Sequence, residues 1–287
     1  MGVRSIMVIG AGQMGGGIAQ TAAQRGFPVT LYDIDREAVN RGVGGISSSL
    51  SRMVKKGSVT EEQKSACLAL IVPTTDLNDA GGADVVIEAA PERLEIKRML
   101  FKELDRLCPP GTVLATNTSS LPITDIAAAA ERPERVIGMH FMNPVPLMPL
   151  VEVIRGIATS DDACSRIMAL AAELGKTAVE VRDFPGFVSN RILMPMINEA
   201  VYAVYEGVAS PQDVDRVMKM GMNHPMGPLE LADFIGLDTC LSIMETLAQG
   251  FGDPKYRPCP LLRKYVSAGW LGRKAGKGFY SYDSVRA

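Results

Sequence analysis

The sequence predicts an α/β protein in which a doubly wound, mainly parallel sheet is followed by a second, all-helical domain. Two observations predict this. Short apolar runs alternate with amphipathic stretches as far as Val181, and no strand pattern persists after Gly186. Alternating strands and helices are typical of a parallel sheet, because two parallel neighbours need a crossover connection, which is usually a helix.

The strands are expected where short runs rich in Val and Ile are bounded by Gly, Pro or Asp. The helices are expected where apolar residues recur at helical spacing, and Thr60 with the acidic residues after it is typical of a helix start. The expected strands are residues 3–9, 28–32, 84–88, 112–116, 135–139, 150–154 and 178–181; the expected helices are residues 14–25, 36–56, 92–107, 187–207, 212–220, 229–248 and 261–268, with further helices opening at Thr60 and near Pro122.

A domain boundary is expected near residues 184–186, within the sequence Asp183-Phe-Pro-Gly. Pro and Gly interrupt regular structure, and the strand pattern stops at this point. A chain of 287 residues is long enough for one large domain or two. We therefore expect a sheet domain over residues 1–185 and a helical domain over residues 186–287.

The charge balance argues against nucleic acid or an anionic membrane as a partner. The chain has 30 basic and 32 acidic residues, and its basic residues form no long run. One small basic cluster, Arg52, Lys55 and Lys56, is either a solvated helix face or a contact for a compact polyphosphate. The longest uncharged stretches are interrupted by Gly or Pro, so none is expected to span a membrane.

The cysteines indicate a reducing compartment. There are five, an odd number, and none forms a C-x-x-C pair or lies near a histidine in the sequence. This pattern argues against a disulfide framework and against a zinc site. We expect a cytoplasmic protein with no bound metal.

A glycine-rich turn follows the first expected strand: Gly10-Ala11-Gly12-Gln13-Met14-Gly15. The pattern is weak by itself, but here it lies between a strand and a helix, as a dinucleotide site requires. Gly10 permits the tight turn, Gly12 lets the backbone approach a pyrophosphate, and Gly15 lets the helix pack on the sheet. The helix N-terminus adds unpaired N–H groups that favour an anion. This context predicts a Rossmann-like nucleotide site.

Asp33, at the end of the second expected strand, favours NAD over NADP. A carboxylate there accepts hydrogen bonds from both ribose hydroxyls and repels a 2′-phosphate. Arg36 is the residue that argues the other way, because its guanidinium is able to pair with that phosphate.

His140 is the first candidate for acid–base chemistry, because the chain has only one other histidine, His224. His140 ends an expected strand, at the edge where open sheets bind ligands. Glu152 is the only charge within the next apolar strand, and a buried carboxylate needs a partner such as a histidine. From these residues alone, a catalytic histidine and a satisfied core histidine remain equally good interpretations. His224 lies among Pro and Gly residues and is better interpreted as a turn histidine.

Polar residues also follow the strand expected at residues 112–116, where the sequence continues Asn117-Thr118-Ser119-Ser120. We expect Ser119 to meet a ligand at this strand end and Ser120 to cap the helix that opens near Pro122.

Seven motifs, taken together and in order, resemble the L-3-hydroxyacyl-CoA dehydrogenase family over essentially the whole chain, and most closely its stand-alone bacterial members that act on the 3-hydroxybutyryl group. The motifs are residues 10–20 (GAGQMGGGIAQ), 87–89 (IEA), 117–120 (NTSS), 138–146 (GMHFMNPVP), 185–191 (PGFVSNR), 223–228 (NHPMGP) and 271–280 (LGRKAGKGFY). Met142 departs from the pattern, since relatives often have an aromatic residue there.

The resemblance implies an NAD-dependent oxidoreductase that interconverts 3-hydroxyacyl-CoA and 3-ketoacyl-CoA, in fatty acid or butanoate metabolism. It implies that His140 is the acid–base residue, that Glu152 orients it, and that the helical domain carries the dimer contact, for which the apolar 229–247 stretch is a candidate. Further residues follow by motif. Ser119 and Asn190 would hold the reacting oxygen and the thioester carbonyl; Ser49 and Lys56 would face the CoA; and Gly10, Gly12, Gln13, Met14, Gly15, Asp33, Glu92, Lys97, Asn117, Ser119, Asn143 and Lys274 would contact NAD.

Two alternatives remain at this stage. One is a dehydrogenase of a free hydroxy acid such as gulonate, whose relatives share the nucleotide domain and the histidine motif. The other is a non-catalytic, crystallin-like NAD-binding protein. The Ser49/Lys56 pair favours CoA, and the joint presence of Ser119, His140, Glu152 and Asn190 favours a working enzyme.

Overall fold

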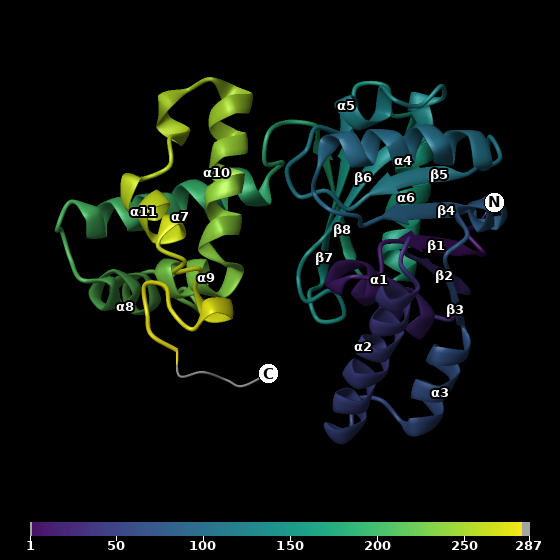
Figure 1. Ribbon diagram of the computed structural model, residues 1–287, viewed down its shortest axis with the longest axis horizontal. Coiled ribbons are helices and arrows are strands. Elements are labelled where there is room, and N and C mark those ends of the chain that lie inside the picture. The colour runs from purple at the N-terminus through teal and green to yellow at the C-terminus, as the bar shows by residue number, and fades with distance from the viewer. Residues whose placement is uncertain (1, 283–287) are drawn as a thin grey trace. The chain divides into compact units, whose positions relative to one another are not determined.

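The computed structural model describes residues 2–282, and the chain divides into two compact units, Met1–Phe184 and Pro185–Ala287 (Figure 1). The first unit is an α/β sheet domain, and the described part of the second contains helices and two isolated β-bridges but no strand. The predicted fold class is confirmed.

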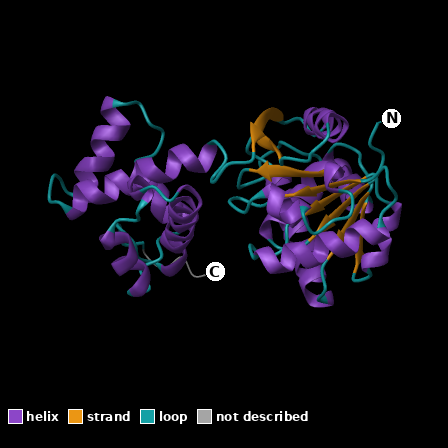
Figure 2. Ribbon diagram, turned by 90° about the horizontal axis from the view of Figure 1, so that it is seen from above, coloured by secondary structure: helices purple, strands orange, loops and turns teal. Residues whose placement is uncertain are grey.

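The sheet has eight strands in the order β3-β2-β1-β4-β5-β6-β7-β8, and helices lie on both of its faces (Figure 2). Strands β1 to β6 are parallel, β7 runs antiparallel to β6, and β8 is parallel to β7. The carboxyl ends of β1 to β6 therefore share one edge, and the amino end of β7 joins them there. The strands are β1 Ile6–Ile9, β2 Val29–Tyr32, β3 Ile71–Thr74, β4 Val85–Glu88, β5 Val113–Thr116, β6 Val136–Phe141, β7 Leu150–Arg155 and β8 Thr177–Arg182.

The central strands are buried because their side chains face helices on both sides, whereas the outer strands β3 and β8 are partly exposed. All four residues of β1, β4 and β5 are buried, as the continuous apolar runs predict. One core cluster joins the sheet to apolar side chains of α1, α2, α3 and α6. The helices of this unit are α1 Gln13–Gln24, α2 Arg36–Lys55, α3 Glu61–Ala69, α4 Leu94–Leu107, α5 Ile123–Ala127 and α6 Asp161–Glu173.

Strand β3 and helix α6 were not among the expected elements. Strand β3 lies at the edge of the sheet and contains Pro73, which cannot donate to a ladder and is tolerated only where one side is unpaired. Helix α6 does carry a start signal: Ser160 accepts a hydrogen bond from the Ala163 N–H, at 3.2 Å.

The second unit packs its helices around a core of its own. These helices are α7 Ser189–Tyr205, α8 Pro211–Gly221, α9 Pro228–Ile235, α10 Leu237–Phe251 and α11 Pro260–Ser267. The single helix predicted over residues 229–248 is wrong: Gly236, at φ +104°, separates α9 from α10. This positive φ strains any residue with a side chain, so the helix ends there.

Most apolar residues of α9 and α10 face the core of this unit, and Phe234 of α9 is the exception at 47% exposure. Leu229, Leu237 and Leu247 have no measurable exposure. The leucines of the 229–247 stretch thus belong to the core of the unit, and Phe234 is the large apolar residue of the stretch that remains available for a dimer contact. Among the described helices of both units, none is long and apolar enough to cross a membrane, and residues 2–282 contain no group of three metal-binding side chains.

Candidate active site

The reversal of direction between β6 and β7 brings His140 and Glu152 together. They are directly paired in the antiparallel ladder, so their side chains lie on the same face of the sheet. The His140 Nδ1 and a Glu152 carboxylate oxygen are 2.9 Å apart, and both side chains are buried.

This pairing has a chemical consequence for the imidazole. An ionised carboxylate accepts the Nδ1–H, which assigns the proton to Nδ1 and the lone pair to Nε2 in the neutral ring. The carboxylate also stabilises the ring after Nε2 takes a second proton. The geometry suits acid–base chemistry, and it equally satisfies the polar groups of a core histidine.

The glycine-rich turn between β1 and α1 has the close contacts that the motif predicts. A Cβ on Gly10 would lie 2.6 Å from the Ala89 carbonyl oxygen, and a Cβ on Gly15 would lie 1.8 Å from the Gly10 carbonyl oxygen. By contrast, nothing lies within 4 Å of a Cβ built on Gly12, which is the N-cap of α1. Gly10 and Gly15 are therefore required for packing, while the exposed backbone at Gly12 allows a ligand to approach.

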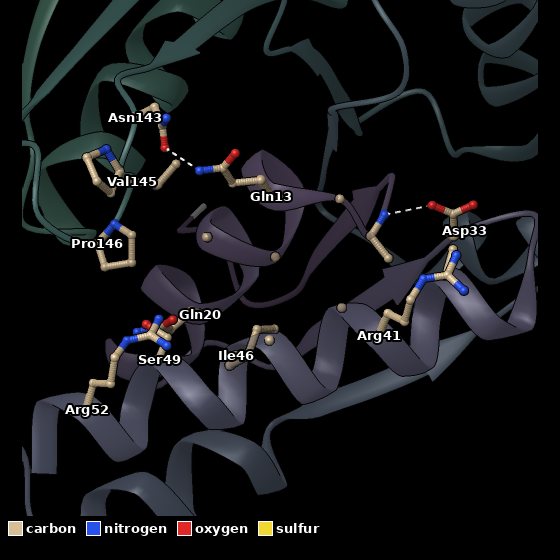
Figure 3. A pocket seen from close by; sticks show the side chains of 18 residues that line it. Gln13, Gln20, Asp33, Arg41, Ile46, Ser49, Arg52, Asn143, Val145 and Pro146 are labelled. Atoms are coloured by element: carbon tan, nitrogen blue, oxygen red, sulfur yellow. Dashed lines mark hydrogen bonds between the residues drawn. The ribbon is translucent and has the colours of Figure 1, made fainter. Parts of the chain in front are cut away.

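A cavity of about 500 Å³ lies over this turn, between α1, α2 and residues 143–146 (Figure 3). Gln13 and Asn143 meet across it, with the Gln13 Nε2 donating to the Asn143 Oδ1 at 3.2 Å. Asp33 lines one end, and Ser49 and Arg52 line the other.

At the Asp33 end, the nearby basic side chains already have partners. The Asp33 carboxylate accepts the Ala11 N–H at 2.9 Å. Arg36 donates to the Thr75 hydroxyl at 3.2 Å, and Arg41, which also lines the cavity, pairs with Asp35. Both arginines thus have partners other than the Asp33 carboxylate.

At the other end, the cavity lining includes one residue of the basic cluster on α2. Arg52 lines the cavity together with Ser49, whereas Lys56 is exposed at the C-cap of α2 and is not part of the lining. Lys55 is also exposed and outside the lining. One member of the basic cluster therefore faces the cavity.

The turn after β5 is held by Glu92 and Asn117. One Glu92 carboxylate oxygen accepts the Thr118 hydroxyl at 2.6 Å, the Ser119 N–H at 2.9 Å and the Ser120 N–H at 3.2 Å. The Asn117 side-chain oxygen accepts the N–H of Phe141, next to His140, at 2.8 Å. Both side chains thus tie the Ser119 turn to neighbouring elements.

The predicted cap for the next helix is wrong. Helix α5 begins after Pro122, and its first N–H groups, those of Ile123 and Thr124, donate to the Asp183 carboxylate at 3.1 and 2.7 Å. Ser120 instead donates its N–H to Glu92. Asp183 lies far along the chain, so local sequence patterns could not identify it as the cap.

Lys97 is almost completely buried, at 1% exposure, beside a carboxylate that sequence reasoning missed. Its ammonium group lies 2.6 Å from Glu88, which ends β4 and is fully buried, and 3.4 Å from Glu92. A signal for Glu88 was present, since it is a lone carboxylate ending the apolar run Val85–Glu88, just as Glu152 is the lone carboxylate of its strand.

Three sequence candidates belong to the helical unit. Asn190 is buried near the start of α7. Lys274 is exposed and pairs with Asp238 at 2.6 Å. The His224 N–H donates to the Met218 carbonyl, and the residue before it, Asn223, has φ +57°, so His224 lies in the loop between α8 and α9.

Comparison with known proteins agrees with the two-unit architecture. The family model described as the 3-hydroxyacyl-CoA dehydrogenase NAD binding domain matches residues 5–184, and the model of the C-terminal domain of the same family matches residues 186–282.

Individual proteins match over nearly the full chain. The chain is 63% identical over 283 residues to a probable 3-hydroxybutyryl-CoA dehydrogenase of Bacillus subtilis, covering 99% of each chain. It is 55% identical to the 3-hydroxybutyryl-CoA dehydrogenase of Bradyrhizobium diazoefficiens, covering 99% of this chain and 97% of the relative. A crystal structure of (S)-3-hydroxybutyryl-CoA dehydrogenase from Ralstonia eutropha superposes with a TM-score of 0.95 at 50% identity, covering 98% of this chain and 100% of that one. The predicted resemblance is confirmed, and the chain belongs to the 3-hydroxyacyl-CoA dehydrogenase family.

Proposed function

We propose that this dehydrogenase interconverts (S)-3-hydroxybutyryl-CoA and acetoacetyl-CoA with NAD as its redox partner. The observation that supports this most directly is the buried His140–Glu152 pair at the same sheet edge as the glycine-rich turn. When bound, NAD supplies the acceptor for the hydride that leaves C3 of the substrate. The His140 Nε2 takes the proton of the 3-hydroxyl group, so the alcohol loses a hydride and a proton and becomes the ketone.

The residues at the turn fit a dinucleotide. The Gly12 backbone faces open space, the N-terminus of α1 follows it, and the Asp33 carboxylate lies at the end of the cavity. We propose that the cofactor is held by the set that the family motifs assign: Gly10, Gly12, Gln13, Met14, Gly15, Asp33, Glu92, Lys97, Asn117, Ser119, Asn143 and Lys274. Lys97, at 1% exposure, would act in this set by holding Glu92 in place.

We propose NAD rather than NADP because of the charges near Asp33. Its carboxylate would repel a 2′-phosphate, and Arg36 is engaged with Thr75. Replacing Asp33 with Ala is expected to lower the ratio of kcat/KM for NADH to that for NADPH. An unchanged ratio would show that Asp33 does not read the ribose.

For the substrate, we propose that Ser119 and Asn190 hold the reacting oxygen and the thioester carbonyl, and that Ser49 and Lys56 face the CoA. Arg52 joins them as a phosphate contact, because it lines the cavity beside Ser49. A guanidinium presents several N–H donors in a plane and suits phosphate oxygens.

The deciding assay is oxidation of NADH by the purified protein with acetoacetyl-CoA, repeated with gulonate and NAD. We expect rapid NADH oxidation with acetoacetyl-CoA and no reaction of gulonate with NAD. Activity with gulonate and none with acetoacetyl-CoA would overturn the CoA assignment. NADH binding without turnover of any hydroxy acid would indicate the non-catalytic alternative.

We propose a homodimer formed through the helical unit, in a reducing compartment such as the cytoplasm. Val217, Met220 and Met222, on and just after α8, are 60%, 80% and 63% exposed, which is unusual for apolar side chains so close together. All five cysteines are unpaired. Light scattering of the wild type and of Met220→Glu tests this: a dimer that the substitution dissociates is expected, and a wild-type monomer would contradict it.

A further inference from the structure

Glu88 has no exposed surface and uses both of its carboxylate oxygens inside the protein. One oxygen accepts the Ala90 N–H at 2.7 Å and lies 2.6 Å from the Lys97 Nζ. The other accepts the Thr116 hydroxyl at 2.6 Å. A group with these contacts and no exposed surface does not reach a ligand, so any effect that it has on a reaction passes through its partners.

The first route from Glu88 runs through Lys97 on α4. Besides Glu88, the Lys97 ammonium group contacts the Ala90 carbonyl oxygen at 3.3 Å and a Glu92 oxygen at 3.4 Å. The other Glu92 oxygen is the acceptor for the Ser119 and Ser120 N–H groups. Lys97 therefore stands between Glu88 and the carboxylate that shapes the Ser119 turn.

The second route runs through Thr116, the last residue of β5. Its hydroxyl donates to Glu88 and also accepts the Thr118 N–H at 3.2 Å. A hydroxyl with its proton committed to Glu88 offers its lone pairs to that N–H. The Glu88 carboxylate is thus linked to the Ser119 turn in two ways, through Thr116 at the end of β5 and through Lys97 and Glu92.

We infer that Glu88 is a positioning residue, which sets the Ser119 turn through Lys97 and Thr116. This inference rests on the proposed function, in which Ser119 contacts both ligands. A buried ion pair contributes little net stability compared with an apolar replacement, so stability alone does not account for two charges at a strand end. A role in holding the Ser119 turn in position for the two ligands does account for these two charges.

The chain offers a matched control on the same helix. Asp105, near the other end of α4, pairs with Arg135 at 2.6 Å, and both side chains are buried. Its carboxylate also accepts the Glu131 N–H at 2.9 Å, outside the proposed site. Asp105→Asn therefore breaks an ion pair of the same class without touching the Ser119 turn.

The experiment compares Glu88→Gln with Asp105→Asn in the full chain. The first readout needs no cofactor: amide hydrogen exchange of a peptide containing Ser119 and Ser120, measured below the melting temperature of each variant. The second is kcat/KM with NADH and acetoacetyl-CoA. In Glu88→Gln we expect exchange of the turn at least ~10-fold faster and kcat/KM about 10- to 100-fold lower, the size of loss that a small misplacement produces. In Asp105→Asn we expect kcat/KM to stay within about twofold of the wild type, and exchange of the turn to stay within about twofold when it is taken relative to a core peptide of the same variant, because this substitution lowers global stability.

Wild-type exchange and wild-type kcat/KM in Glu88→Gln would overturn the inference, as would equal changes in both variants. If Glu88→Gln does not fold, Thr116→Val removes one of the two routes without leaving an unpaired charge and is expected to speed exchange of the same peptide; wild-type exchange there would also overturn it. If the wild type does not turn over acetoacetyl-CoA, the proposed function fails, and the exchange comparison still decides the role of Glu88.

Discussion

A buried ion pair that includes a residue of α4 lies at each end of the parallel strands, one at their carboxyl ends (the carboxyl edge) and one at their amino ends (the amino edge). The surroundings of the two pairs differ. At the carboxyl edge, the partners of Glu88 and Lys97 lead to the turn that carries Ser119. At the amino edge, Arg135 donates to the carbonyls of Pro109 and Thr112, which closes the connection before β5. Burial and distance are nearly the same in both pairs. The difference teaches that the remaining hydrogen bonds of a buried charge, and not its burial, indicate whether it serves a site.

The largest effect is expected at the carboxyl edge from His140→Ala. Removing the acid–base group should lower kcat at least ~10²-fold while leaving NADH affinity nearly unchanged. Single-turnover kinetics and fluorescence titration of NADH measure the two quantities. A variant with near wild-type turnover would move the proton transfer to another residue, and the same substitution at His224 is the control.

Glu152→Gln should have the next largest effect. The amide keeps the shape of the carboxylate but removes the charge that favours the protonated ring, so we expect kcat to fall at least ~10-fold with little change in melting temperature. The pH dependence of kcat is the accompanying measurement. Unchanged turnover would mean that Glu152 serves only to satisfy a buried histidine.

At the amino edge the expected effect is on stability. Asp105→Asn leaves the Arg135 guanidinium buried without its counter-charge, which typically lowers the free energy of unfolding by about 3 to 5 kcal/mol. Urea unfolding followed by circular dichroism measures this. If Asp105→Asn instead lowers kcat in fully folded protein and leaves stability unchanged, the pair at the amino edge would also serve the site, and the distinction between the two pairs would be lost.

The smallest expected effect is in thiol reactivity. Burial raises the pKa of Cys67 and of Cys108 to about 11, so fewer than about one in a hundred of these thiols is ionised at pH 8. We expect a disulfide reagent to label native protein slowly at pH 8, faster as the pH rises, and at all five cysteines after denaturation. Asp105→Asn should speed labelling of Cys108 first; faster labelling of Cys67 instead would place the loosened region elsewhere.

Sequence reasoning predicted much of the fold, because most strands are continuous apolar runs and the glycine-rich turn has a specific context. It missed β3, since an edge strand with Pro73 lacks the pattern of a buried one. It also joined α9 to α10, because the apolar spacing continues across Gly236 and only the positive φ of this residue reveals the break.

For the candidate site, the lone carboxylate within an apolar strand predicted the contact between Glu152 and His140. The same signal was available for Glu88 and its meaning depended on Lys97, whose partners are set by tertiary packing. Which cation of α2 lines the cavity, Arg52 or Lys56, depends on the rotation of the helix relative to its neighbours, which the spacing of charges alone does not determine.

The antiparallel pairing of β6 with β7 also bears on how such an enzyme diversifies. His140 and Glu152 are aligned by the ladder itself, in a register that pairs Gly138 with Ile154 and Phe141 with Val151. The intervening residues 142–149 supply neither side chain of the pair, although four of them line the cavity. Variation in this connection is therefore able to reshape the neighbouring cavity while the acid–base pair is inherited unchanged.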